Sequence, residues 1–463
     1  MKNALLLLCI YLAFTMGLIF LFRLYFKNTL KAALFTFLIM GLNFFFGYLY
    51  DSIKSFFPAT FFPGSFALKY GIILLVALLA LASISFMLKK KKSIPGKASA
   101  YLNILLYVFI IIDLGILTKK TINFFYGGEK KLYVQNGLIC AKSKKPDVYF
   151  LLADEYAGSM QLKDVFEFDN SSFLDSLRQK GFFVANNSRS NYGFTTYSMA
   201  SLLNMDYLGL KKSQVRKIDN IFTLKLICDN KVCNFFKDAG YEIYNYSVFD
   251  INGQFTQDKN SFVPARTKLI TSQTFLNRMK ADLWMIMAKK FKLRKVLEKN
   301  LYETLNYNQK IYQHILNTIH STGTVRKFVY THLELPHFPY YYDQFGNPYP
   351  DEIMVNNAPG DKIKYIEYLK YTNKVLLKLV DEIINNNQTP PVIILMSDHG
   401  FRWLAGGAGK YEFSNLFSVY LPDKNYSQFN DSITSVNVFR ALLNTEFCQQ
   451  SRMLKDTTIA IGK

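Results

Sequence analysis

Residues 146–155 read Pro-Asp-Val-Tyr-Phe-Leu-Leu-Ala-Asp-Glu, a short apolar run that stops abruptly at two acidic residues. Such a run predicts a buried β-strand over 148–153, of the kind found inside a parallel sheet. Similar strands are expected at 182–185, 241–244, 327–330 and 391–396, and a helix is expected over Asp361–Asn385. Short strands that alternate with longer helices are typical of an α/β domain, which we expect over residues 145–463.

Three of the predicted strands are followed by side chains that commonly bind metals. Asp154 follows the first strand, His337 comes after the strand at 327–330, and Asp398 with His399 follows the last. Ligands bind beyond the carboxyl ends of strands in open parallel sheets, so we expect these side chains to meet at one edge. Taken singly, Asp154 reads as a helix N-cap and His337 as a turn residue. Together, in a chain with only five histidines, they favour one site.

The N-terminal part of the chain has a different composition, because nearly every long uncharged run lies before residue 118. Four segments approach the ~20 residues that a helix needs to cross a bilayer. They are Ala4–Phe22, Ala32–Tyr50, Tyr70–Leu88 and Tyr101–Leu117. The fourth is the shortest and carries Asp113, so a soluble core helix is its alternative. We therefore predict a transmembrane bundle of about four helices over 1–120, followed by a linker over 121–144.

Basic residues in the short connections predict the orientation of these spans. The connections at 23–31 and 89–97 carry three and five lysine or arginine residues, whereas 51–69 carries Lys54 and Lys69 against Asp51. The positive-inside rule places the two basic connections in the cytoplasm. With four spans, the C-terminal domain is then extracytoplasmic, in an integral protein of the inner or plasma membrane. Three or five spans would invert this result.

The net charge of +21 indicates an anionic partner, and in a chain with membrane spans the lipid surface is the simplest one. No zinc-finger spacing, RNA-binding signature or basic arm is present, so we expect no nucleic acid partner. The five cysteines include no C-x-x-C, which makes a thiolate metal site improbable. Cys228 and Cys233 either pair in an oxidising compartment or remain two free buried thiols.

The quoted stretch resembles the opening strand of the sulfatase-like branch of the alkaline phosphatase superfamily, in which the first acidic residue after the strand is a metal ligand. Ser397–Gly400 resembles the second metal-ligand motif of that superfamily, and His332 with Pro336–Pro339 resembles its intervening His-rich segment. The motifs follow in the same order over roughly residues 145–425. This resemblance implies an α/β/α sandwich of alkaline-phosphatase/sulfatase type and a metal-dependent enzyme.

Asn191–Leu203 looks like the strand-to-helix turn that presents the nucleophile in that superfamily. Thr195 with Ser198 matches the Thr-x-x-Ser arrangement of the membrane-bound phosphoethanolamine and phosphoglycerol transferases, the relatives of lipoteichoic acid synthase. The Cys/Ser-x-Pro-x-Arg motif of true sulfatases is missing. The resemblance therefore favours phosphoryl transfer over sulfate-ester hydrolysis. Thr196 is the alternative nucleophile, or else a helix N-cap.

The same resemblance implies one divalent ion, zinc or manganese, with magnesium or calcium as further options. Its expected ligands are Asp154, Thr195, Asp398 and His399. A threonine hydroxyl needs such activation to act as a nucleophile at neutral pH. His337, and less surely His332, would hold the non-bridging oxygens or protonate the leaving group. No histidine follows His399, which favours one ion over two.

Two charged residues beside these motifs have open roles. Glu155 is either a second metal ligand or an N-cap carboxylate. Arg402 is close enough to the Ser-Asp-His-Gly motif to reach a phosphate, although a surface salt bridge is its alternative.

The expected function is transfer of a phospholipid headgroup to a cell-envelope glycan or lipid acceptor through a phosphothreonine. A hydrolase of phospho- or sulfuric esters on surface glycans is the alternative, and a non-enzymatic membrane protein with a degenerate domain is a third reading. The products formed from a labelled lipid would separate the first two. Unchanged cell-surface chemistry in Thr195→Ala, with no bound metal, would support the third. The sequence leaves the headgroup, the acceptor and the oligomeric state open.

Overall fold

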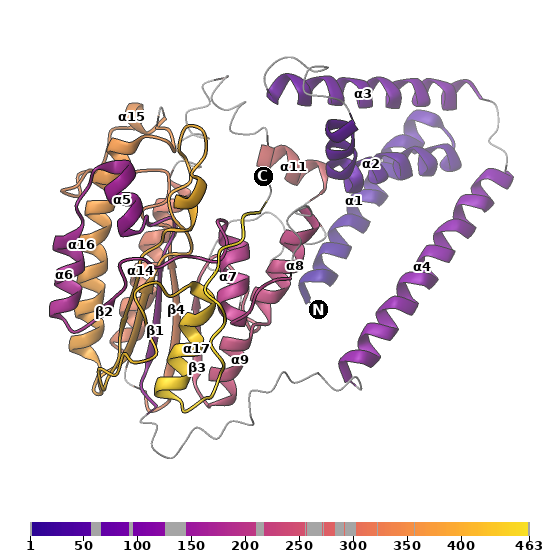
Figure 1. The fold of residues 1–463 in the computed structure, drawn as a ribbon. Coiled ribbons are helices and arrows are strands. Elements are labelled where there is room, and N and C mark those ends of the chain that lie inside the picture. Colours follow the sequence, from indigo (N-terminus) through magenta and orange to yellow (C-terminus); the bar gives the residue numbers. More distant parts are fainter. Residues whose placement is uncertain are drawn as a thin grey trace. The chain divides into compact units, whose positions relative to one another are not determined.

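The computed structural model describes residues 2–56, 66–91, 96–125, 145–209, 217–254, 256, 271, 273–282, 291, 302–321, 323–355 and 357–461. The chain forms two compact units (Figure 1). One consists of Met1–Leu132 with Ser261–Leu297, and the other of Tyr133–Asn260 with Glu298–Lys463. Most of the predicted linker, residues 126–144, lies outside the described residues, and the boundaries at 120 and 145 stay a prediction.

The first unit contains the apolar helices. They are α1 (Lys2–Phe26), α2 (Thr29–Phe56), α3 (Phe66–Lys90) and α4 (Gly96–Phe125). Within the described residues, Leu5–Phe26, Thr29–Ile53 and Gly71–Lys90 are long and apolar enough to cross a membrane, and Ala100–Ile116 of α4 forms a shorter apolar stretch. The sequence predicts a bundle of about four such helices, and an apolar N-terminal bundle of three to four helices is thus confirmed.

Contacts inside this unit agree with the predicted arrangement of its connections. The Lys31 ammonium, at the start of α2, donates to the backbone oxygen of Lys91, just after α3, at 2.5 Å. Both residues belong to the basic connections that the positive-inside rule assigns to the cytoplasm. The two connections therefore lie on one side, as a helical hairpin of two spans requires.

A helix from far along the chain, α11 (Phe275–Asp282), packs on α2. The Phe275 ring meets Phe46 edge to face at 5.0 Å, and the amide of Gly47 donates to the backbone oxygen of Gln273 at 2.8 Å. These contacts lie near the C-terminal end of α2, which leads into the connection predicted to be extracytoplasmic.

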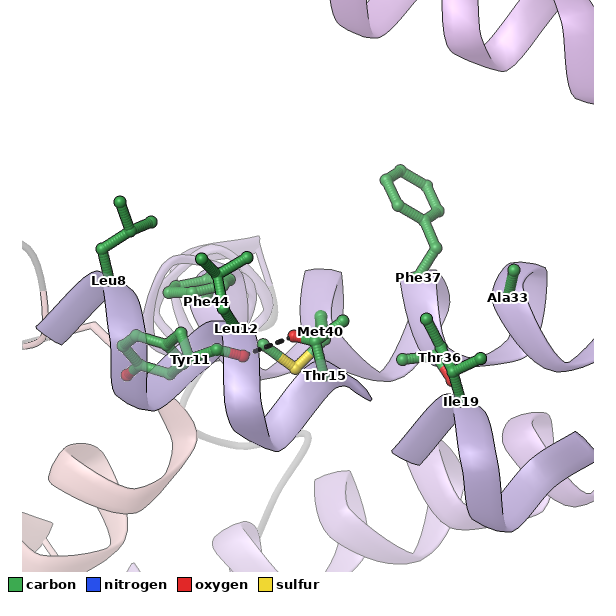
Figure 2. Close-up of a pocket in the computed structure, with 10 residues that line it drawn as sticks. All are labelled: Leu8, Tyr11, Leu12, Thr15, Ile19, Ala33, Thr36, Phe37, Met40 and Phe44. Carbon is green, nitrogen blue, oxygen red and sulfur yellow. Dashed lines mark hydrogen bonds between the residues drawn. The ribbon is translucent and has the colours of Figure 1, made fainter. Parts of the chain in front are cut away.

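An apolar groove lies between α1 and α2 (Figure 2). Its lining residues are Leu8, Tyr11, Leu12, Thr15, Ile19, Ala33, Thr36, Phe37, Met40 and Phe44. The Thr15 hydroxyl donates to the Tyr11 carbonyl at 2.7 Å, so its polar atom is satisfied within its own helix. This is the way a membrane helix accommodates a hydroxyl group.

The second unit is built on one mixed sheet of six strands in the order β2-β6-β5-β1-β4-β3. The strands are β1 (Val148–Ala153), β2 (Phe183–Val184), β3 (Glu242–Tyr246), β4 (Lys327–Leu333), β5 (Val392–Met396) and β6 (Phe417–Tyr420). Strands β5, β1, β4 and β3 run parallel, whereas β6 pairs antiparallel with both β5 and β2. Each predicted strand overlaps an observed one, and β6 is the strand that the sequence analysis did not identify.

Helices cover both faces of this sheet, which gives the expected α/β/α sandwich (Figure 1). Helices α7 (Thr195–Asn204), α9 (Lys231–Asp238) and α17 (Ser435–Glu446) pack on one face. Helices α5 (Ser159–Phe166), α6 (Ser171–Gln179), α14 (Glu303–Ile319) and α16 (Lys362–Asn386) pack on the other. The unit also contains α8 (Lys217–Cys228), α15 (Asp351–Val355) and the 3-10 turn η1 (Gly409–Phe413).

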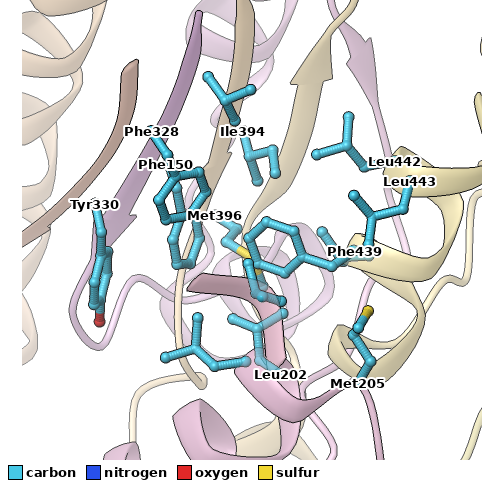
Figure 3. Close-up of a cluster of buried hydrophobic side chains, with 14 of the residues drawn as sticks. Phe150, Leu202, Met205, Phe328, Tyr330, Ile394, Met396, Phe439, Leu442 and Leu443 are labelled. Atoms are coloured by element: carbon cyan, nitrogen blue, oxygen red, sulfur yellow. The ribbon is translucent and has the colours of Figure 1, made fainter. Parts of the chain in front are cut away.

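Strand β1 explains why both faces are apolar. Val148, Phe150 and Leu152 belong to the core under α7 and α17, and the alternate residues belong to the opposite core. Figure 3 shows Phe150 among the side chains of the first core, where its ring stacks on Tyr330 at 4.9 Å. A strand buried on both faces needs a continuous apolar run, which is the pattern of residues 148–153.

The structure also shows the state of the cysteines. Cys228 and Cys233 are not joined to each other by a disulfide; Cys233 is buried, as the second of the two alternatives expects, whereas Cys228 is half-buried. Burial raises the pKa of the Cys233 thiol to about 12. Cys448 takes part in a disulfide, which agrees with a domain in an oxidising compartment.

Candidate active site

The carboxyl ends of three parallel strands bring the predicted site residues together. Leu152 of β1 is in register with His332 of β4 and with Met396 of β5. Asp154 and Asp398 follow their strands by one or two residues, and the Asp154 amide donates to the Leu333 oxygen at 2.9 Å. The chain folds this way because parallel strands in register end at one edge of the sheet.

Asp154, Asp398 and His399 form a candidate metal centre. Their ligand atoms all lie within 4.8 Å of one another, and all three residues are buried. Within the described residues, Oδ1 of Asp154 and Oδ2 of Asp398 are buried without a hydrogen-bond partner. Buried carboxylate oxygens are costly unless a donor or a cation compensates them. These three residues therefore fit a divalent cation.

The His399 ring is oriented for this role. Its Nδ1 lies 2.8 Å from the Gly400 oxygen, which requires Nδ1 to carry the proton. Its Nε2 then presents a lone pair toward Oδ2 of Asp398 at 3.1 Å. A backbone acceptor on the far nitrogen is the usual way in which a protein fixes the tautomer of a metal-binding histidine.

Thr195 lies beside this cluster as the first residue of α7. Its Oγ1 is 3.2 Å from Nε2 of His399, and the residue is half-buried. Three residues along the helix, the Ser198 hydroxyl donates to the Asp398 carbonyl at 2.6 Å. The Thr-x-x-Ser pattern therefore brings one hydroxyl to the cluster, while the other joins α7 to the Ser-Asp-His-Gly motif. Thr196 is also half-buried, one position further along α7.

The two histidines proposed for catalysis have different surroundings. His332 is fully buried, with Nε2 at 3.4 Å from Oδ2 of Asp154 and Nδ1 at 3.0 Å from the Tyr330 hydroxyl. His332 therefore stabilises the Asp154 carboxylate from the buried side of the site. His337 keeps 28% of its side chain exposed, and its Nε2 lies 3.6 Å from Oε2 of Glu155. His337 is the histidine that a substrate can reach.

The charges around the site shift two pKa values in opposite directions. Burial by itself raises the pKa of Asp154, but the charge of His337 and the hydrogen bond with His332 hold it well below its usual range. Burial by itself lowers the pKa of His337, but the nearby carboxylates of Asp154, Glu155 and Glu334 raise it above its ordinary value. The site thus favours the ionised form of Asp154 and the protonated form of His337.

Several residues that shape the site were missed by the sequence analysis. A Cβ at Gly400 would lie 2.5 Å from the Ser414 oxygen and would also press against the Tyr411 oxygen, so the motif can end only in glycine. Trp403 donates its Nε1 to Glu155, and Tyr330 meets His332. Of these residues, only Gly400 could have been recognised from the sequence, as the last residue of the Ser-Asp-His-Gly motif. The roles of Trp403 and Tyr330 depend on partners that the fold supplies.

Comparison with known proteins found similar solved structures and one matching family. Among solved structures, the C-terminal periplasmic domain of EptC from Escherichia coli is 16% identical, with a TM-score of 0.40, over 70% of this chain and 92% of that one. The integral membrane lipooligosaccharide phosphoethanolamine transferase A from Neisseria meningitidis is 14% identical, with a TM-score of 0.39, over 80% of this chain and 69% of that one. No curated protein sequence matches the chain.

The family of the chain follows from a sequence model. The model described as Sulfatase matches residues 148–439, which is more than half of the chain. The chain therefore belongs to the sulfatase family, and its second unit is the catalytic domain of an enzyme.

Proposed function

We propose that this protein is a membrane-anchored, metal-dependent phosphotransferase. It would move a phospholipid headgroup, of phosphoethanolamine or phosphoglycerol type, to a glycan or lipid acceptor of the cell envelope. The observation that carries the proposal is the hydroxyl of Thr195, 3.2 Å from His399 and beside the Asp154–Asp398–His399 cluster. An unmodified threonine at the start of a helix suits a phosphoryl group, because the helix N-terminus stabilises negative charge.

The residues present support two successive displacements at phosphorus. A divalent ion held by Asp154, Asp398 and His399 would lower the pKa of the Thr195 hydroxyl and so make it nucleophilic. Thr195 Oγ1 attacks the phosphorus and loses its proton to solvent, and the bond from phosphorus to the lipid alcohol breaks. His337, whose protonated form the nearby carboxylates favour, gives its proton to the departing alkoxide. The result is a phosphothreonine and a neutral lipid alcohol.

The second step returns the enzyme to its starting state. The acceptor hydroxyl gives its proton to the now neutral His337 and attacks the phosphothreonine. The Thr195–phosphorus bond breaks, Thr195 recovers a proton, and the headgroup leaves on the acceptor. A single histidine can serve both steps because the first leaves it as the base that the second requires.

Three features support a lipid donor and an ion of the zinc or manganese type. The apolar helices place the enzyme in the membrane, and the net charge of +21 attracts anionic lipid surfaces. One imidazole with carboxylate and hydroxyl oxygens suits zinc or manganese, with magnesium and calcium as weaker candidates. The contacts of α11 and the disulfide of Cys448 agree with an extracytoplasmic catalytic domain.

The family assignment itself favours a second candidate, a hydrolase of phospho- or sulfuric esters on surface glycans. The two activities differ in the fate of the headgroup. In the transferase, label from a headgroup-labelled phospholipid appears on a macromolecular or lipid acceptor. If all label appears as free headgroup in water, the hydrolase is the correct function.

Mass spectrometry of the protein after incubation with phospholipid tests the nucleophile directly. We expect a headgroup-phosphate adduct on the peptide that contains Thr195, and its mass names the headgroup. Thr195→Ala removes the adduct, whereas Thr196→Ala retains it. Chelation with EDTA abolishes adduct formation, and readdition of zinc or manganese restores it. An adduct on Thr196 instead would move the nucleophile by one residue and leave the family unchanged.

A further inference from the structure

Glu155 stands next to the candidate ligand Asp154, but its backbone turns it in another direction. Its φ of 59° lies in the left-handed region, which is costly for a residue with a side chain. Its amide donates to Oδ1 of Asp398 at 3.0 Å, and its carbonyl accepts from the Tyr365 hydroxyl at 2.9 Å. These two hydrogen bonds hold the backbone in this conformation.

The Glu155 carboxylate is buried, and its contacts are with residues outside the candidate metal cluster. Its Oε1 accepts the Arg402 amide at 3.2 Å, and its Oε2 accepts Nε1 of Trp403 at 3.2 Å. Two cations also lie near it, Nε of Arg402 and Nε2 of His337, each at 3.6 Å. The candidate metal cluster consists of Asp154, Asp398 and His399 and does not include Glu155.

These contacts would all be lost if Glu155 turned to bind a metal. The movement would remove two hydrogen bonds to a carboxylate and would separate Arg402 and His337 from that carboxylate. Breaking a buried charge pair in this way is strongly unfavourable. The geometry therefore favours a carboxylate that organises its neighbours.

The groups that Glu155 organises form a rim next to Thr195, which we define as Phe194, Arg402 and Trp403. The Arg402 guanidinium lies 4.9 Å from the Phe194 ring centre and donates to the Gly193 oxygen at 3.3 Å. Phe194 immediately precedes Thr195, and 45% of it is exposed; Trp403 is 46% exposed. The rim thus combines a guanidinium with two exposed rings, of which Phe194 lies against the guanidinium and Trp403 binds the same carboxylate as Arg402.

We propose that Glu155 is a positioning residue rather than a metal ligand, and that the rim it holds binds the part of an anionic amphiphile next to the reacting phosphorus. The guanidinium suits a phosphate or carboxylate oxygen, and the flanking rings suit glyceryl and acyl carbons. The inference rests on the proposed function for the identity of that substrate. The role of Glu155 in holding Arg402, Trp403 and His337 stands independently of it.

The test uses the full-length, metal-loaded protein in detergent with Glu155→Gln, which keeps the size of the side chain and removes its charge. Metal content is measured by elemental analysis, with Asp154→Asn as the control that removes a ligand. We expect Glu155→Gln to keep its metal and Asp154→Asn to lose it. Loss of metal from Glu155→Gln would overturn the proposal and make Glu155 a ligand.

Tryptophan fluorescence gives a readout that needs no turnover. The chain has two tryptophans, so a Trp284→Phe background isolates the emission of Trp403. Glu155→Gln should shift that emission and increase its quenching by acrylamide, because Trp403 loses a charge-assisted hydrogen bond. An unchanged spectrum and unchanged quenching would mean that Glu155 does not hold the rim.

Kinetics test what the rim binds. For a dispersed anionic phospholipid, we expect Glu155→Gln and Trp403→Phe to raise KM by about tenfold, the effect of losing one good hydrogen bond to a charged group. For bis(p-nitrophenyl) phosphate, which lacks acyl chains, Trp403→Phe should leave KM nearly unchanged. An equal rise for both substrates would refute the apolar part of the rim. Trp403→Phe also keeps the proposal testable if Glu155→Gln does not fold.

The outcomes separate this inference from the proposed function. If neither substrate is turned over, the proposed function fails, whereas the metal and fluorescence results still decide the role of Glu155.

Discussion

His337 shows how the residues of this site set one another's protonation. Burial lowers the pKa of its imidazole, but three carboxylates, from Asp154, Glu155 and Glu334, raise it above the ordinary value. Glu334 is affected in turn, because burial and the charge of Asp154 raise the pKa of its carboxyl. A sequence cannot reveal this balance, since the carboxylates come from the ends of two different strands.

We therefore expect His337 to titrate above the ordinary pKa of about 6.5 in the metal-free protein. Because the folded-state pKa is raised, protonated His337 stabilises the fold fully below pH ~6.5, and this contribution disappears as pH rises through the higher folded value. NMR titration and urea unfolding at several pH values measure both effects. His314 is the control, because burial and Lys310 lower its pKa. A His337 that titrates below His314 would contradict the prediction.

Gly400 provides a steric prediction at the same scale. Its missing Cβ leaves room for the backbone oxygens of Tyr411 and Ser414, which cannot move without disturbing the turn that follows His399. Gly400→Ala should destabilise the protein by about 2 kcal/mol or more and weaken metal binding. Gly323→Ala is the matched control, since open space surrounds that position, and it should change stability by less than about 1 kcal/mol. Urea unfolding and metal titration measure the two effects; equal stabilities would refute the steric argument.

At the scale of secondary structure, the best-predicted elements are those whose pattern is local. Strand β1 is a continuous apolar run, and α16 begins after Asp361, whose side chain accepts the Lys364 amide at 3.1 Å as an N-cap. Strand β6 escaped prediction because Phe417–Tyr420 has only four residues and pairs antiparallel with β5. Its identity as a strand depends on that partner more than on its own sequence.

The packing of α11 on α2 could not be predicted from any local sequence pattern, and it can be tested by mutation. Arg278 and Asp51 form an ion pair of 2.9 Å, with Arg278 11% exposed, and the guanidinium also lies 5.7 Å from the Tyr50 ring centre. Arg278→Glu should lower the thermal stability of the detergent-solubilised protein. Adding Asp51→Arg should restore part of it, with a coupling free energy of about 0.5–1 kcal/mol. Strictly additive effects of the two substitutions would contradict this contact.

At the scale of the whole molecule, several independent observations support the same orientation in the membrane. The basic connections are brought together by the contact between Lys31 and Lys91. The segment between β3 and α14 docks at the opposite end of α2, and Cys448 is in a disulfide. All three agree with a cytoplasmic side for the lysine-rich connections and an extracytoplasmic side for the catalytic domain.

Cysteine labelling in intact cells checks this orientation. Phe345 is 73% exposed in the catalytic unit, and Lys91 is exposed in a basic connection. A membrane-impermeant maleimide should label Phe345→Cys in intact cells and should label Lys91→Cys only after lysis. The native cysteines Cys9, Cys228 and Cys233 are first replaced by serine or alanine. Labelling of Lys91→Cys but not of Phe345→Cys in intact cells would mean that the orientation is inverted. The same labelling behaviour at both positions would mean that α4, which lies between them, does not span the membrane.

The sequence by itself determined the features that depend on short stretches of chain. Apolar length predicted the membrane helices, the run at 148–153 predicted a doubly buried strand, and Asp154, Asp398 and His399 were recognisable because each follows a strand directly. Their convergence could be inferred because parallel strands end at one edge of a sheet. The motif around Thr195 added the candidate nucleophile.

Only the tertiary structure decided which way each polar side chain faces and what it meets. Glu155 was open between metal ligand and N-cap, and the fold directs it to Arg402 and Trp403 instead. Cys228 and Cys233, although close in sequence, are not joined to each other by a disulfide, because helical geometry and packing set the direction of their side chains. The physical reason is the same in each case. The apolar periodicity of a helix or strand can be read from the residues of that element alone. The partner of a buried charge or thiol comes from another element, which only folding brings near.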